Sequence, residues 1–167
     1  MNWDSQLVTF FNQALAHPLL DVLMVCVTAG AMPLSALGPL ILMLAGKRRE
    51  GLALLATFVL STLLAVGLQL VVMRPRPADV RVVLSAPAFP SFPSGHAAAV
   101  FGGAVLVFFV WRRAGAAALL GAFLVALSRL YLGQHYPSDL LGGAVLGASV
   151  ATAIYCRWFP PARAKPR

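Results

Sequence analysis

Long apolar runs separated by short polar segments dominate this chain. Five runs reach or approach the roughly 20 residues that a helix needs to cross the hydrocarbon core of a bilayer. They cover residues 19–45, 51–73, 95–111, 114–132 and 138–158, and the third and fourth lie near the short limit. The pattern predicts an all-α integral membrane protein, a helical bundle of about five transmembrane helices.

The N-terminal segment, residues 2–16, is too polar to span a membrane. Its apolar side chains nevertheless recur at near-helical spacing, as Trp3, Leu7, Phe10, Phe11 and Leu15. This spacing predicts an amphipathic helix that lies in the membrane interface. The dipeptide His17-Pro18 ends that helix, and we expect His17 to be exposed.

Composition restricts the class of protein further. The 167 residues are 60% hydrophobic and 11% charged, which excludes an ordinary soluble globular protein. The net charge of +8 lies mostly at the ends of apolar runs, so we expect contact with membrane lipids and not with nucleic acid. Cys26 and Cys156 lie inside apolar runs and are predicted to be buried apolar residues. We expect one domain over residues 1–159 and a basic cytoplasmic tail over 160–167; protein partners cannot be read from the chain.

The basic residues also predict an orientation. Five spans place three basic groups on one side, which the positive-inside rule makes cytoplasmic. These groups are Lys47 to Arg49, Arg112 with Arg113, and Arg157 with the basic residues of the tail. Arg74, Arg76, Arg81 and Arg129 fall on the outer side.

Three polar clusters interrupt the apolar pattern on that outer side. They are Arg74-Pro75-Arg76-Pro77, Pro93-Ser94-Gly95-His96, and Ser128-Arg129 followed by His135 and Asp139. A charged side chain costs roughly 2.5–3.5 kcal/mol at the centre of a membrane helix. Each cluster alone could be an interfacial anchor, a helix cap or a structural pair. Their placement on one membrane face favours a shared site.

The residue types suit phosphoryl transfer. Ser94 is a natural N-cap, and the first backbone N–H groups of the helix that it starts can bind an anion. Gly95 allows a phosphate to approach the backbone closely. The arginines can bond two phosphoryl oxygens at once. A carboxylate at Asp139 can orient His135 and stabilise its positive charge.

Taken together, these residues resemble the type 2 phosphatidic acid phosphatase superfamily of membrane lipid phosphatases. The family signature is K-x6-R-P, then P-S-G-H, then S-R-x5-H-x3-D. The second and third parts are complete here, and the first keeps Arg76-Pro77 but has Gln69 in place of lysine. The resemblance covers residues 69–139 by motif and the whole chain by helical pattern.

The resemblance implies a role for each matching residue. His135 would form a phosphohistidine, Asp139 would orient it, and His96 would protonate the leaving oxygen. Arg76, Arg129, Ser94 and the Gly95 amide would hold the phosphoryl oxygens. The five acidic residues of the chain do not form an oxygen cage for a metal, so we expect neither a metal nor another cofactor.

Two questions remain open at this stage. Gln69 can line the phosphate site, with Arg74 compensating for the absent lysine, or it can face a neighbouring helix and bond across it. The chain looks most similar to the small bacterial undecaprenyl-diphosphate phosphatases of the inner membrane, with the site on the outer face. The alternatives are a phosphatidic acid or phosphatidylglycerophosphate phosphatase, and a catalytically inactive lipid-binding or transport protein.

Overall fold

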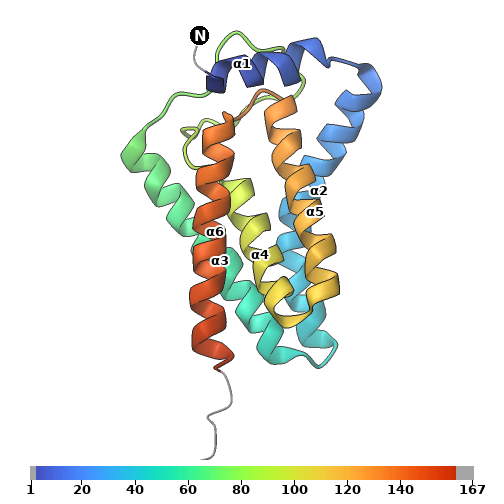
Figure 1. Ribbon diagram of the computed structural model, residues 1–167, viewed down its shortest axis with the longest axis vertical. Helices are drawn as coiled ribbons and strands as arrows, with labels where there is room; N and C mark the ends of the chain where they lie inside the picture. Colours follow the sequence, from blue (N-terminus) through green and yellow to red (C-terminus); the bar gives the residue numbers. More distant parts are fainter. Residues whose placement is uncertain (1–2, 161–167) are drawn as a thin grey trace, which may run out of the picture.

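The computed structural model describes residues 3–160, and in this range it contains helices and loops but no strand (Figure 1). Helix α1 (Trp3–Thr9) continues into a short π-helical segment, η1 (Phe10–Ala14). A bundle follows, made of α2 (Pro18–Leu44), α3 (Arg48–Val72), α4 (Gly95–Val110), α5 (Arg112–Tyr131) and α6 (Pro137–Trp158). These bundle helices coincide with the five apolar runs, so the predicted all-α membrane fold is confirmed.

Helix α4 is the short member of the bundle. In the described part of the chain, α2, α3, α5 and α6 are each long and apolar enough to cross a membrane. Helix α4 has 16 residues, about 24 Å at 1.5 Å per residue, which is less than the roughly 30 Å of hydrocarbon. Figure 1 shows that α4 begins below the ends of α5 and α6. The start of α4 is therefore recessed within the bundle.

Two glycines let α6 approach α4 closely, and this pair makes the most extensive helix contact. A Cβ atom at Gly143 would lie 2.4 Å from the Ser94 carbonyl oxygen, and one at Gly147 would lie 2.1 Å from that of Ala98. Only glycine fits at these positions, as in other close membrane helix pairs. This packing fixes the start of α4 beside the first turns of α6.

Helix α1 lies across one end of the bundle (Figure 1). Trp3, Leu7 and Phe10 are exposed, whereas Asp4 and Asn12 on the opposite face are buried. This two-faced distribution is that of the expected interfacial helix. His17 is exposed, as predicted, and its Nδ1 caps α2 by accepting a hydrogen bond from the Leu19 amide.

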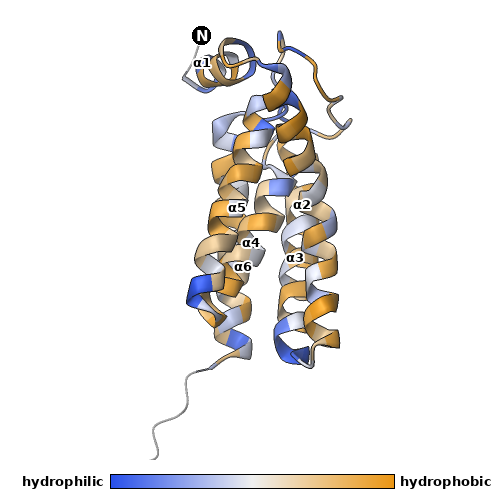
Figure 2. Ribbon diagram, turned by 90° about the vertical axis from the view of Figure 1, so that its right-hand side faces the viewer, coloured by the Kyte–Doolittle hydropathy of each residue, from blue (hydrophilic) through white to orange (hydrophobic). Residues whose placement is uncertain are grey.

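The outer surface of the bundle is apolar, as expected for a surface that faces lipid (Figure 2). This explains why the prediction for the cysteines was wrong: Cys26 and Cys156 are exposed rather than buried. Lipid chains outside the bundle are as apolar as its interior. An apolar run therefore identifies a span without showing which of its residues face inward.

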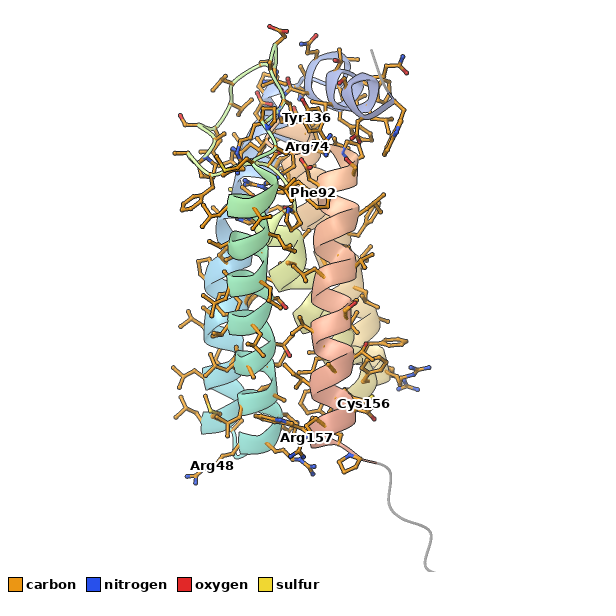
Figure 3. All side chains as sticks on the ribbon, turned by 90° about the vertical axis from the view of Figure 1, so that its left-hand side faces the viewer. Arg48, Arg74, Phe92, Tyr136, Cys156 and Arg157 are labelled. Atoms are coloured by element: carbon orange, nitrogen blue, oxygen red, sulfur yellow. The ribbon has the colours of Figure 1, made fainter. Side chains whose placement is uncertain are left out.

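Charged residues gather at the two ends of the bundle. Figure 3 shows Arg48 and Arg157 at one end, and Arg74 and Tyr136 at the other. This separation agrees with the predicted division into a basic side and a side that carries the candidate chemistry. The predicted tail, apart from Pro160, lies outside the described residues.

Candidate active site

The loop between α3 and α4 brings two distant segments together. Helix α3 ends at Val72, and its C-cap Met73 has a φ of 51° that turns the chain out of the helix. Ser91, which is fully buried, donates its amide to the Arg74 carbonyl (2.8 Å) and its hydroxyl to the Pro75 carbonyl (3.0 Å). These bonds hold Ser91 against the first polar cluster.

A second turn, between α5 and α6, delivers His135 to the same place. Gly133 has a φ of +67°, which glycine adopts readily at the end of a helix. The Gln134 amide donates to the Arg129 carbonyl at 3.0 Å and completes the turn. The chain then enters α6 at Pro137, so His135 lies between two helix ends.

The contacts of His135 determine its tautomer. Its Nδ1 lies 2.9 Å from the Ser91 carbonyl oxygen, which can only accept a hydrogen bond, so Nδ1 carries the proton. The other ring nitrogen, Nε2, is therefore left with a lone pair. An N–H of Arg76 lies 3.3 Å from Nε2 and points at that lone pair.

Burial lowers the pKa of His135 to about 4; Arg129 and Arg76 also lower it, and Asp139 opposes them. The imidazole is therefore neutral at neutral pH. A neutral ring with an unprotonated Nε2 can act as a nucleophile.

Asp139 lies beside His135 but outside hydrogen-bonding distance. Its Oδ2 is 3.7 Å from the Nδ1 of His135 and accepts from the Tyr136 amide at 2.8 Å. Its Oδ1 accepts from Arg74 at 2.6 Å. At this distance Asp139 can stabilise a positive charge on the ring, while the Ser91 carbonyl fixes the tautomer.

Arg76 is held in place by backbone carbonyls. Its Nε donates to Phe89 at 2.8 Å, and the terminal nitrogen that faces His135 also donates to Gln134 at 2.7 Å. The guanidinium is thus fixed beside Nε2, and no carboxylate between residues 3 and 160 forms an ion pair with it. It can present its charge to an anion that approaches His135.

Arg129 reaches the site from α5 and is buried. One terminal nitrogen donates to the Thr28 hydroxyl of α2 at 2.8 Å. Its Nε is buried and, in the part of the chain that the structure describes, has no hydrogen-bond partner. A buried donor without a partner is costly, and a bound phosphoryl oxygen would satisfy it.

The start of α4 completes the cluster. Ser94 is its N-cap, and its hydroxyl oxygen accepts from the Ala97 amide at 3.4 Å. A Cβ atom at Gly95 would meet no atom within 4 Å, so there is open space beside the helix N-terminus. The Ser94 amide donates to the Asp139 carbonyl at 3.0 Å, and Arg76 contacts His135, so the three predicted clusters meet in one place.

Gln69 and Arg74 have other partners. Gln69 donates to the Pro93 carbonyl at 2.8 Å, which favours the alternative in which it bonds across to a neighbouring segment. Arg74 donates to the carboxylates of Asp139 (2.6 Å) and Asp4 (2.9 Å). Both residues lie at the site, but these contacts hold protein groups in place.

Four residues at this site have no place in the sequence prediction: Asp4, Thr28, Ser91 and Gln134. Ser91 and Gln134 contribute backbone carbonyls, which leave no trace in a motif. Thr28 is a lone polar residue in an apolar run, and Asp4 lies in a segment that was interpreted by its apolar positions. Over residues 3–160 no group of three or more His, Cys, Asp or Glu side chains is arranged to hold a metal.

Comparison with known proteins gives a consistent family. The family model described as PAP2 superfamily matches residues 50–162. Decaprenylphosphoryl-5-phosphoribose phosphatase of Mycolicibacterium smegmatis is 40% identical over 118 residues, which are 70% of this chain and 63% of that protein. Undecaprenyl-diphosphatase of Sulfolobus acidocaldarius is 30% identical over 121 residues, 67% of this chain and 57% of that protein. The chain thus spans less than two thirds of the length of either relative.

A solved structure is similar over nearly the whole chain. The crystal structure of Aquifex aeolicus LpxE matches with a TM-score of 0.78 and 30% sequence identity, covering 92% of this chain and 95% of that one. This chain and that protein therefore share their arrangement of helices.

Proposed function

The chain belongs to the PAP2 superfamily, and on that premise we propose that it is a membrane lipid phosphatase acting through a phosphohistidine on His135. The observation that carries the proposal is the state of this ring: Nδ1 is bound to the Ser91 carbonyl, and Nε2 faces an arginine. An inactive lipid-binding protein needs cations but no such nucleophile. We therefore favour an enzyme over a binding or transport protein.

In the first step, the Nε2 lone pair of His135 forms a bond to phosphorus as the bond between phosphorus and the leaving oxygen breaks. The negative charge of the bound phosphoryl group favours the protonated form of His96, which gives its proton to that oxygen. The phosphorylated ring keeps its Nδ1 proton and becomes cationic, and Asp139 at 3.7 Å stabilises that charge. Arg76, Arg129, Ser94 and the Gly95 amide hold the phosphoryl oxygens.

In the second step, water attacks phosphorus and gives a proton to His96. The phosphorus–nitrogen bond breaks, inorganic phosphate leaves, and His135 returns to its neutral Nδ1–H form. His96 is protonated again and is ready for the next turnover. Water, consumed in the second step, is the only co-reactant that the two steps need.

We assign Gln69 and Arg74 to support of the site instead of direct contact with phosphate. The Gln69 amide holds the Pro93 carbonyl, directly before the Ser94 cap. Arg74 holds Asp139, the neighbour of the nucleophile. The charge of the missing family lysine is then not replaced, and Arg76 and Arg129 are the cations that face the phosphate.

A cavity beneath the site supports a substrate with a long apolar tail. It has a volume of about 600 Å³ and is lined by α2, α3, α4 and α5, with mostly small side chains in its wall. Ala99 and Val125 line it, one helical turn deeper than His96 and Arg129 respectively. A phosphate at the site would thus place its attached tail in this cavity.

The named activities of the two relatives favour a polyprenyl tail, and we propose an undecaprenyl-diphosphate-type substrate. A phosphatidic acid or phosphatidylglycerophosphate substrate is the second candidate, because a groove of small residues also accepts an acyl chain. We place the protein in a bacterial inner membrane with the site on the outer face. That placement rests on the basic residues at the opposite end of the bundle.

Phosphate release by the purified protein from a panel of lipids tests this proposal. The panel holds polyprenyl diphosphate, polyprenyl monophosphate, phosphatidic acid and phosphatidylglycerophosphate. We expect hydrolysis by the wild type, with polyprenyl diphosphate preferred by kcat/KM, and none by His135→Ala. A preference for a diacyl lipid would replace the proposed polyprenyl substrate with the second candidate. Hydrolysis of none of these lipids would overturn the proposal that the protein is a lipid phosphatase.

A further inference from the structure

Asp4 is a buried carboxylate that the proposed reaction does not use. It lies on the surface helix α1 and is 5% exposed. Its Oδ1 accepts from the Ser138 amide at 3.0 Å, and its Oδ2 accepts from the Ser138 hydroxyl and from Arg74 at 2.9 Å. Burial raises the pKa of Asp4, but the bonds from Ser138 and Arg74 outweigh it and hold the pKa below its usual value. Asp4 is therefore an ionised group with fixed partners.

Arg74 is the partner that connects Asp4 to the site. One terminal nitrogen of its guanidinium donates to Asp4, and the other donates to Asp139 at 2.6 Å and to the Ser138 hydroxyl at 2.7 Å. The guanidinium also lies 4.3 Å from the centre of the Tyr136 ring. Figure 3 shows Arg74 and Tyr136 together at this end of the bundle. Arg74 thus bridges one carboxylate on α1 and another in the first turn of α6.

The chain of contacts ends at the nucleophile. Asp139 gives one oxygen to Arg74, and its other oxygen lies 3.7 Å from His135. Both oxygens belong to one carboxylate, so the bond from Arg74 to Oδ1 helps to fix where Oδ2 lies beside His135. Without Asp4, Arg74 would lose one of its two carboxylate partners.

We propose that Asp4 is a positioning residue for His135, acting through Arg74 and Asp139, so that α1 completes the catalytic centre. The inference rests on the role of His135 proposed above. Helix α1 exposes Trp3 and Leu7 on its other face, and the adjoining η1 exposes Phe10. Such side chains favour the membrane interface. Helix α1 then has two roles: it contacts the membrane, and it helps to position His135.

The test compares Asp4→Asn with Asp79→Asn in the full chain. Both substitutions remove one negative charge at the same end of the bundle. Asp79 is exposed, and its side chain forms no ion pair with any residue between 3 and 160. Its φ of 56° is one that asparagine adopts readily. It is therefore a matched control for charge.

For Asp4→Asn we expect kcat to fall by about tenfold with KM within about twofold, since Asp4 touches no substrate. The loss should be the same on a substrate with an acidic leaving group, because attack by His135 is affected and not protonation by His96. The side-chain ¹⁵N resonances of His135 should shift in Asp4→Asn and stay in place in Asp79→Asn. Asp79→Asn should keep wild-type kcat.

An Asp4→Asn protein with wild-type kcat and unshifted His135 resonances would overturn the inference. So would a lowered Tm with an unchanged kcat per folded molecule. If Asp4→Asn does not fold, Ser138→Ala removes one donor to Asp4 and should lower kcat by about threefold at constant KM; an unchanged kcat would then overturn it. His135→Ala separates the two proposals: activity in that protein ends the proposed function, whereas inactivity beside a fully active Asp4→Asn ends only this inference.

Discussion

Thr28 holds one terminal nitrogen of Arg129, and replacing it with valine should reveal what that bond contributes to catalysis. Thr28→Val keeps the shape of the side chain and removes the hydroxyl oxygen that lies 2.8 Å from the guanidinium. Both residues are buried, at 3% exposure each, so water cannot replace the acceptor. The Nε of Arg129 already lacks a partner in the described chain, and the variant would leave a second donor unpaired.

The size of the effect follows from this geometry. A hydrogen bond to a charged group contributes roughly 1.5–3 kcal/mol, and about 1.4 kcal/mol corresponds to tenfold in rate. If Arg129 binds the phosphoryl group from the position that Thr28 gives it, kcat/KM on lipid phosphate should fall about 10- to 150-fold. Thr28→Ser keeps the hydroxyl and should stay within about threefold of wild type.

A double-mutant cycle separates this role from a general loss of stability. In an Arg129→Ala background, Thr28→Val should cost little further activity, because the bond that it removes no longer exists. Thr28→Val with wild-type kcat/KM would refute the reasoning. An equal loss with and without Arg129 would also refute it, since Thr28 would then act on something else.

Three further predictions concern the nucleophile, the altered motif and the topology. Since the pKa of His135 is lowered to about 4, its ring should stay neutral as pH falls from 7 and become protonated only near pH 4, as followed by ¹⁵N-histidine NMR; titration near the ordinary histidine value would contradict this. Gln69→Leu should lower Tm in detergent because it breaks the bond to Pro93, with kcat/KM nearly unchanged; the opposite pattern would return Gln69 to the phosphate site. In a cysteine-free background, a cysteine at Ala88 should react with an impermeant thiol reagent in intact spheroplasts and one at Ala114 only after lysis, and the reverse would move the site to the cytoplasm.

The fold could be predicted because its main determinant is the length of apolar runs. All five runs became helices of the bundle, including the short one at Gly95–Val110. The direction in which each residue faces could not be predicted in the same way. Cys156, which is exposed, shows the reason. A membrane helix is apolar both where it faces lipid and where it packs against other helices, so the apolar pattern does not identify the core.

The candidate site was predictable where side chains of unusual type carry it. His96, Arg129 and His135 are expensive in an apolar chain. The structure brings the segments that carry them together through backbone bonds from Ser94 to Asp139 and from Gln134 to Arg129. The groups that hold them are of another kind. The Ser91 carbonyl is a backbone atom, and Asp4 lies more than sixty residues from Arg74 in the sequence. Neither contact is encoded in local spacing, so both become visible only in the folded chain.

The central claim is that His135 becomes covalently phosphorylated during turnover. The most direct measurement is to mix the enzyme with lipid substrate carrying radiolabelled phosphate, quench in alkali, in which phosphohistidine survives, and locate the label by peptide mapping. The account predicts label on His135 within the first turnover, no label and no activity in His135→Ala, and loss of the label on a chase with unlabelled substrate. Label on another residue, or full turnover by His135→Ala, would contradict it.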